Sequence, residues 1–73
     1  MEKLLKNLRV MDLQIKHAIA QDKTGTGLVV YALHDAEQLM RALVARNAYS
    51  EVDMSVAWEP DMGYAFKVYV WWD

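Results

Sequence analysis

The sequence predicts a single α+β domain, a two-layer sandwich in which two helices cover one face of a three-stranded sheet. Two patterns carry this prediction. Apolar residues recur at helical spacing in two segments, and they alternate with other residues in two strands near the C-terminus. Turn signals separate the segments, which follow in the order α-β-α-β-β. Because the chain has 73 residues, we expect residues 1–73 to form one domain with a small core.

The first segment, residues 2–20, is predicted to be an amphipathic helix. Its apolar stripe either packs on the sheet or forms a dimer seam, since about two heptads are too few for a sustained coiled coil. Basic residues occupy the other side, which is either solvated or a contact with membrane or nucleic acid. The stripe consists of Leu4, Leu8, Met11, Ile15 and Ala18.

The middle of the chain is predicted to hold a connector, a short strand and a second helix. Residues 22–27 contain glycines but follow a helix instead of preceding one, so we interpret them as a connector and not as a phosphate-binding loop. Residues 28–33 are apolar and partly β-branched, which indicates a strand. Asp35 is predicted to cap the next helix, with Gln38 completing a capping box. That helix is expected to bury Ala36, Leu39, Met40, Leu43 and Val44.

The last third of the chain is predicted to be a β-hairpin. Residues 59–63 combine proline, aspartate and glycine as a turn does, and a loop of this length pairs Trp58 with Tyr64 and Val52 with Val70. The turn length and the apolar alternation of the two strands therefore predict the same register. The crossover rule leaves the first strand parallel to the second or separated from it by the third. We expect the helices to cover the face made by Val52, Met54, Val56, Trp58, Tyr64, Phe66, Val68 and Val70.

The opposite face of the hairpin is expected to stay open. It carries Glu51, Asp53, Lys67, Tyr69 and Trp71. In one interpretation these residues form ordinary cross-strand pairs on a solvated sheet. In the other they form a docking site, because Trp and Tyr are enriched among the residues that dominate binding energy. We take all of them as candidate partner-binding residues.

No arrangement of residues in the sequence indicates catalysis, a metal or a cofactor. The chain has no cysteine, which excludes thiol catalysis and thiolate metal sites and is typical of a reducing compartment. His17 and His34 have no further ligands at metal-binding spacing. Glu51 and Asp53 share a face, but so small a sheet offers no cleft in which one could act as acid and the other as base. We therefore expect a non-enzymatic protein.

Composition and charge restrict the location and the partners. No apolar run approaches the ~20 residues that span a bilayer, and charged residues interrupt the N-terminal segment. A membrane helix and a signal peptide are therefore not predicted, and we expect a cytoplasmic protein. The net charge is −2, with the acidic residues concentrated in the sheet. An acidic and aromatic sheet face favours a basic partner surface, which is common on proteins that handle nucleic acid.

The predicted function is a small protein-binding module that inhibits or regulates a larger protein or complex. A short, cysteine-free chain without a catalytic motif is typical, in our interpretation, of accessory proteins encoded by phages and mobile elements. One alternative is single-stranded nucleic acid stacked on the open sheet, although the carboxylates of Glu51 and Asp53 would repel phosphates. Another is a structural homo-oligomer, since a domain of this size is marginally stable alone. It would be joined through the first helix or an edge strand.

Overall fold

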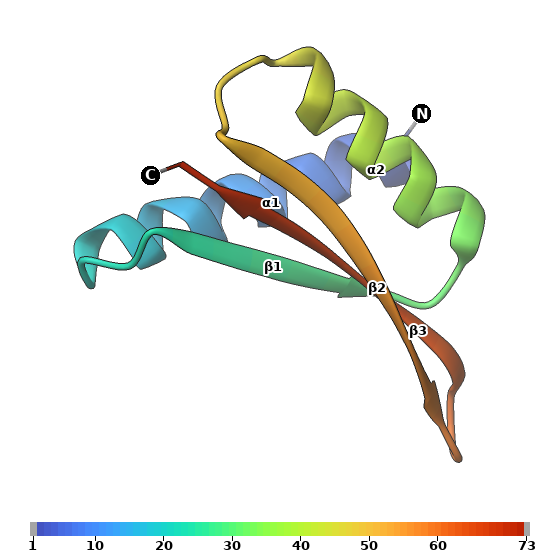
Figure 1. The fold of residues 1–73 in the computed structure, drawn as a ribbon. Coiled ribbons are helices and arrows are strands. Elements are labelled where there is room, and N and C mark those ends of the chain that lie inside the picture. Colours follow the sequence, from blue (N-terminus) through green and yellow to red (C-terminus); the bar gives the residue numbers. More distant parts are fainter. Residues whose placement is uncertain (1, 73) are drawn as a thin grey trace.

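The computed structural model describes residues 2–72, which form two helices and one three-stranded sheet (Figure 1). The predicted order α-β-α-β-β and the α+β class are confirmed. The elements are α1 (Glu2–Ala20), β1 (Gly25–Val30), α2 (Leu33–Ala45), β2 (Glu51–Glu59) and β3 (Gly63–Trp71).

β3 is the central strand, and β1 and β2 both run antiparallel to it, in the order β1-β3-β2. β1 is thus separated from β2 by the third strand, which is one of the two arrangements that the crossover rule predicted. The hairpin has the predicted register, with Val52 opposite Val70 and Trp58 opposite Tyr64. In the other ladder Thr26 also lies opposite Val70. Because side chains alternate along a strand, even-numbered residues of all three strands share one face of the sheet and odd-numbered residues the other.

Both helices pack on the even-numbered face, as predicted, and the core lies between the two layers. Met11 of α1, Leu39 and Leu43 of α2, and Val68 and Val70 of β3 are completely buried there. α1 packs against β1 and α2, while α2 contacts all three strands. α2 is therefore the element that covers the hairpin.

The second helix begins earlier than predicted, at Leu33, and Ala32 is its N-cap without a side-chain hydrogen bond. Asp35 lies in the first helical turn and forms an ion pair with Lys3 of α1 at 3.1 Å. The capping box of Asp35 and Gln38 is thus a wrong prediction, since this carboxylate instead favours the helix N-terminus and joins the two helices. The preceding strand also starts earlier, so the glycines assigned to a connector belong to β1.

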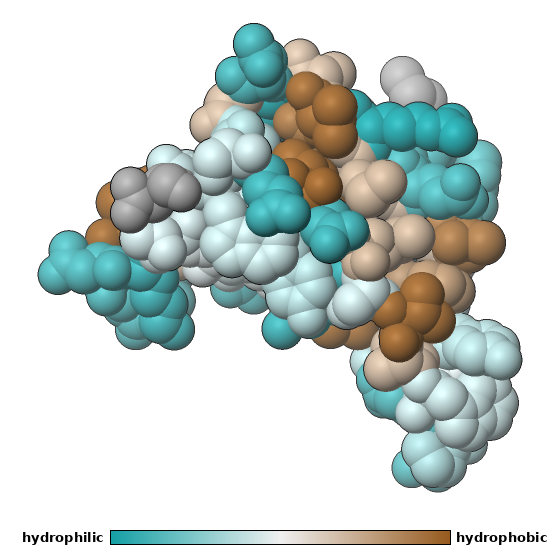
Figure 2. All heavy atoms as spheres, viewed as in Figure 1, coloured by the Kyte–Doolittle hydropathy of each residue, from teal (hydrophilic) through white to brown (hydrophobic). Residues whose placement is uncertain are grey.

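The β2–β3 hairpin extends beyond the helical layer, and its outer part stands out from the rest of the molecule (Figures 1 and 2). Trp58 is 63% exposed and Tyr64 is 59% exposed, so the prediction that the helices cover this whole face is wrong for its outer part. The reason is length. The 13 residues of α2 span about 20 Å, whereas nine-residue strands span about 30 Å.

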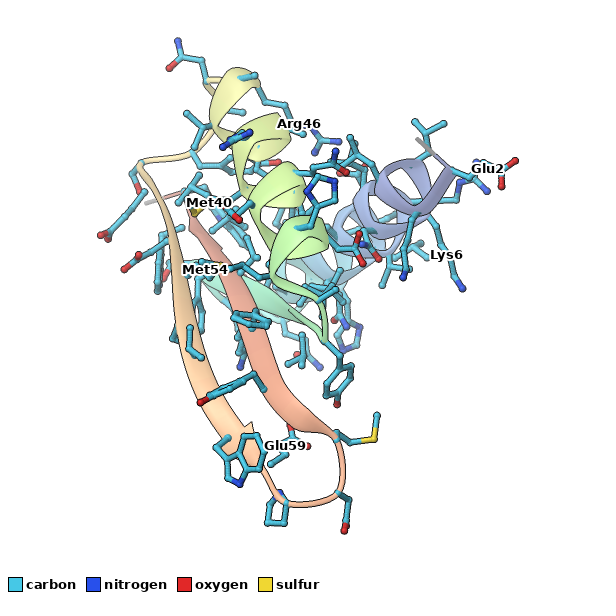
Figure 3. The ribbon with its side chains drawn as sticks, turned by 90° about the vertical axis from the view of Figure 1, so that its right-hand side faces the viewer. Glu2, Lys6, Met40, Arg46, Met54 and Glu59 are labelled. Carbon is cyan, nitrogen blue, oxygen red and sulfur yellow. The ribbon has the colours of Figure 1, made fainter. Side chains whose placement is uncertain are left out.

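We call the row of even-numbered side chains on the outer part of the hairpin the arm face; it consists of Val56, Trp58, Tyr64 and Phe66. Phe66, at its inner end, is partly buried and packs against the core. Met40 of α2 and Met54 of β2 both pack against the core, whereas Figure 3 shows Glu59 at the far end of the hairpin, away from both helices. The arm face therefore begins where the cover from α2 ends.

Candidate functional site

The predicted partner-binding residues lie together on the odd-numbered face of the sheet, which neither helix covers. Trp71 pairs with Glu51 and Tyr69 pairs with Asp53 across the β2–β3 ladder. Lys67 precedes Tyr69 by two positions on β3, so its side chain leaves the same face. We call these residues the open face. Their proximity follows directly from the hairpin register.

Tyr69 and Trp71 stack on each other along β3. Their ring centroids are 5.3 Å apart and their planes differ by 15°. The Lys67 ammonium lies 5.0 Å from the centroid of the Tyr69 ring, in a cation–π contact. Ser55 Oγ donates a hydrogen bond of 3.4 Å to the hydroxyl of Tyr69. These contacts hold the rings in one orientation, so little side-chain entropy would be lost if a partner bound them.

Two glycines of β1 make room for this aromatic row. Gly25 lies opposite Trp71, and Gly27 lies opposite Tyr69. A Cβ atom at Gly25 would lie 2.5 Å from Cδ1 of Trp71, and one at Gly27 would lie 2.9 Å from Cε of Lys67. The side chains thus lean over β1, and both rings are half-buried. Sequence analysis missed this role of the glycines because it placed them in a connector.

The aromatic row separates two charge environments. Glu51 and Asp53 are exposed on the β2 side. The Asp53 carboxylate also accepts a hydrogen bond of 2.8 Å from the backbone N–H of Met54. On the β1 side, an open groove of about 630 Å³ runs along the C-terminal part of α1 and is bordered by the two rings. Its charged or titratable lining residues include His17, Asp22, Lys23 and Lys67.

The arm face is an aromatic cluster that sequence analysis did not identify as exposed. Trp58 and Tyr64 meet edge to face, with ring centroids 5.0 Å apart and an interplanar angle of 71°. Phe66 continues the row, 6.5 Å from Tyr64. The signal in the sequence was the difference in length between the second helix and the strands beneath it, because a short helix cannot cover a longer hairpin.

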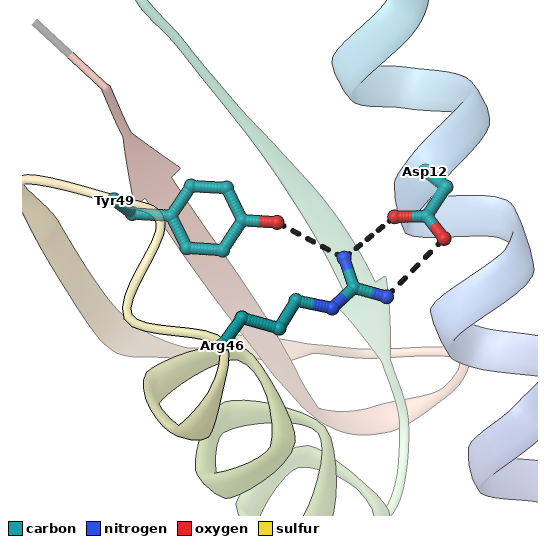
Figure 4. Close-up of polar contacts among 3 residues, drawn as sticks. All are labelled: Asp12, Arg46 and Tyr49. Carbon is teal, nitrogen blue, oxygen red and sulfur yellow. Dashed lines mark hydrogen bonds and ion pairs between the residues drawn. The ribbon is translucent and has the colours of Figure 1, made fainter.

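A polar contact joins α1 to the residues that follow α2 (Figure 4). The guanidinium of Arg46 donates hydrogen bonds of 2.6 and 3.2 Å to the two carboxylate oxygens of Asp12 and one of 3.0 Å to the hydroxyl of Tyr49. These bonds, the one to Asp12 first, raise the pKa of Arg46 above its ordinary value. Each group has a partner within this cluster, so we assign it a structural role.

Residues 2–72 contain no group of three or more His, Cys, Asp or Glu side chains placed to hold a metal ion. Within the same range, every buried side-chain nitrogen or oxygen has a hydrogen-bond partner. Neither of the two described helices has the length and apolar character needed to cross a membrane. The open face with its groove and the arm face are the surfaces of this part of the chain where aromatic side chains contact one another.

Comparisons with known protein families, curated proteins and solved structures found no match to this chain. Function therefore has to be inferred from the chemistry of these surfaces.

Proposed function

We propose that this protein is a small non-enzymatic binding module that inhibits or regulates a larger protein by docking through its open face. The observation that carries the proposal is the pre-stacked pair of Tyr69 and Trp71 on a sheet face without helical cover. Tyrosine and tryptophan combine a large apolar area with a polar atom, which makes them frequent centres of binding energy. Because neighbouring contacts already hold the rings, the entropic cost of binding them is low.

The charges beside the rings favour a partner with a basic surface. Glu51 and Asp53 are exposed next to the stack, where a lysine or arginine of the partner could pair with a carboxylate and lie over the ring of Trp71. Basic surfaces of this kind are common on proteins that contact the phosphates of nucleic acid. We place the interaction in the cytoplasm, since the chain has no cysteine and needs no disulfide.

The test is a comparison of two tryptophans on opposite faces. Tagged protein captures partners from a lysate of the cells that encode the chain, and affinities are then measured with purified components. Trp71→Ala should weaken binding by about 30-fold or more, the loss expected for a central aromatic anchor. Trp58→Ala, which removes the same type of side chain from the arm face, is the control and should bind like the unmodified protein.

The thermal midpoint of Trp71→Ala distinguishes loss of a contact from loss of the fold. We expect it to change little, since the ring of Trp71 is half-buried and lies outside the helix–sheet core. A captured protein that binds Trp71→Ala normally, or that loses affinity only for Trp58→Ala, would contradict docking through the open face.

Single-stranded nucleic acid is a second candidate, favoured by the lysines in the groove. Lys23 and Lys67 line it beside the aromatic rings, on which unpaired bases could stack. Against this, the rings already stack on each other, and the carboxylate of Asp53 lies across the ladder from Tyr69. Short oligonucleotides titrated at two salt concentrations decide between the partners. Affinity that falls steeply with salt and is lost in Lys67→Glu would favour nucleic acid.

A further inference from the structure

We propose that the arm face is the contact surface for a second copy of this chain, and that two arms pack face to face in a symmetric dimer. Trp58, Tyr64 and Val56 are each more than half exposed. Their side chains leave the same side of the projecting hairpin, where Trp58 and Tyr64 contact each other. An exposed apolar cluster is often a functional contact surface. The arm face lies on the opposite side of the sheet from the open face, so this contact does not depend on the proposed function.

The absence of charge on the arm face favours an identical copy as its occupant. Valine, tryptophan, tyrosine and phenylalanine are uncharged, so two copies of this row can approach without repulsion. The open face differs, because Glu51 and Asp53 would meet carboxylates of the same type in a symmetric contact. The net charge of −2 adds a general repulsion between copies. A symmetric contact is therefore most favourable at the arm face.

The helical layer leaves space of the right depth for a second arm. A helix is about 10 Å wide, and two packed sheets are also separated by about 10 Å. An arm of the second copy laid over Trp58 and Tyr64 would therefore continue the layer that α2 forms over the inner part of the hairpin. A two-fold axis relates the two arms, so each covers the other and the assembly closes as a dimer.

The exposed area is sufficient for a reversible dimer. A buried aromatic side chain removes roughly 150–250 Å² from water, and more than half of Trp58 and Tyr64 is still exposed. Together with Val56, which is also more than half exposed, each copy can contribute on the order of 300–400 Å². The total of roughly 600–800 Å² lies below the ~1,000 Å² of stable specific interfaces and fits a weak, transient dimer. We therefore expect association that depends on concentration.

Pairing through the edge of β2 is one competing mode, and the structure limits it. The backbone N–H of Trp72 donates a hydrogen bond to the carbonyl of Thr24, on the β1 side of β3. Because backbone groups alternate in direction along a strand, the even-numbered residues of β3 direct theirs toward β1. Odd-numbered residues of β3 then bond to odd-numbered residues of β2, and the even-numbered residues of β2 face the free edge. The N–H of Met54 is one of these edge donors, and the carboxylate of Asp53 already occupies it. This edge donor is therefore already paired, and the charged side chain of Asp53 at the edge disfavours strand pairing there.

Sedimentation equilibrium over a range of concentrations tests the dimer. The unmodified protein should show a monomer–dimer equilibrium, and Trp58→Lys should weaken self-association by about 30-fold or more because it places a charge in the contact. Leu13→Lys is the matched control, since Leu13 on α1 is 64% exposed, almost the same fraction as Trp58. It should associate like the unmodified protein. Both variants should keep the unmodified circular dichroism spectrum, because both side chains lie outside the core.

Three results would overturn the proposal. The first is an unmodified protein that stays monomeric up to millimolar concentration. The second is a dimer that dissociates in Leu13→Lys but not in Trp58→Lys. The third is a monomer that loses a captured partner in Trp58→Lys, which would assign the arm face to a different protein. Trp71→Ala should dimerise normally, so failure of the dimer and failure of docking through the open face are distinguishable.

Discussion

The inner and outer halves of the β2–β3 hairpin have the same alternating pattern but different surroundings. In the inner half, Val68 and Val70 are completely buried beneath the helices. In the outer half, Trp58 and Tyr64 lie on the same face and remain mostly exposed. The alternation determines which side chains share a face, whereas the length of the covering helix determines which of them are buried.

The two halves also expose aromatic side chains on opposite faces of the sheet. The inner half presents the open face, where Glu51 and Asp53 flank the stacked rings of Tyr69 and Trp71. The outer half presents the uncharged arm face on the other side of the sheet. Because the two surfaces differ in place and in charge, a dimer formed through the arms would leave both open faces free for partners.

The largest effect that we expect is a difference in stability between aspartate variants of the inner and outer halves. Val68→Asp would bury a carboxylate without a partner in the inner half, at a cost of several kcal/mol. A domain of this size has little stability to lose, so the variant should not fold. Val56→Asp makes the same change in the outer half, where the side chain is 54% exposed, and should melt within a few degrees of the unmodified protein. Circular dichroism melts of dilute samples measure both, and equal midpoints would show that the halves are equally covered.

The sequence predicted which residues lie beside one another better than it predicted how far the helices extend over the sheet. The hairpin register was predictable, because the Pro-Asp turn and the alternation of both strands independently favour it. The start of α2 was not, since Asp35 pairs with Lys3 from a distant part of the sequence and no local pattern reveals that pair. The open face was predictable as a set of residues, but its stacking over Gly25 and Gly27 depends on the β1–β3 register, which no turn specifies.

The next effect concerns the glycine beneath the aromatic row. Gly25→Ala would place a Cβ atom against the ring of Trp71 and 2.9 Å from the carbonyl oxygen of Val70. Such overpacking costs about 1–3 kcal/mol, and the displaced ring should also lose its near-ultraviolet dichroism from the stack with Tyr69. Chemical denaturation and near-ultraviolet spectra measure the two effects.

A double variant isolates the contribution that the clash with the Trp71 ring makes to the loss of stability. Gly25→Ala combined with Trp71→Ala should recover part of the lost stability, since the clash with the ring is removed while the approach to Val70 remains. Strictly additive free energies of unfolding would mean that Trp71 does not lie against Gly25. The ring of Trp71 would then not lean over β1.

The smallest effect tests whether the outer half is independent of the helices that cover the inner half. Arg46→Ala removes the bidentate contact with Asp12 and the hydrogen bond to Tyr49, so we expect a loss of about 1 kcal/mol that diminishes in high salt. Arg41→Ala is the control. Its ion pair with Glu37 is long, at 3.9 Å, and joins residues within one helix, so removing it should cost only a few tenths of a kcal/mol.

Urea denaturation at two salt concentrations measures these losses, and sedimentation of the same samples measures the dimer. If the arm is independent, Arg46→Ala should shift the unfolding midpoint without changing the dissociation constant. A parallel weakening of the dimer would mean that the position of the helices influences the arm face. In that case the end of α2 would contribute to the contact between copies. The part of the hairpin that depends on the helices would then extend closer to the turn than the exposure of Val56 indicates.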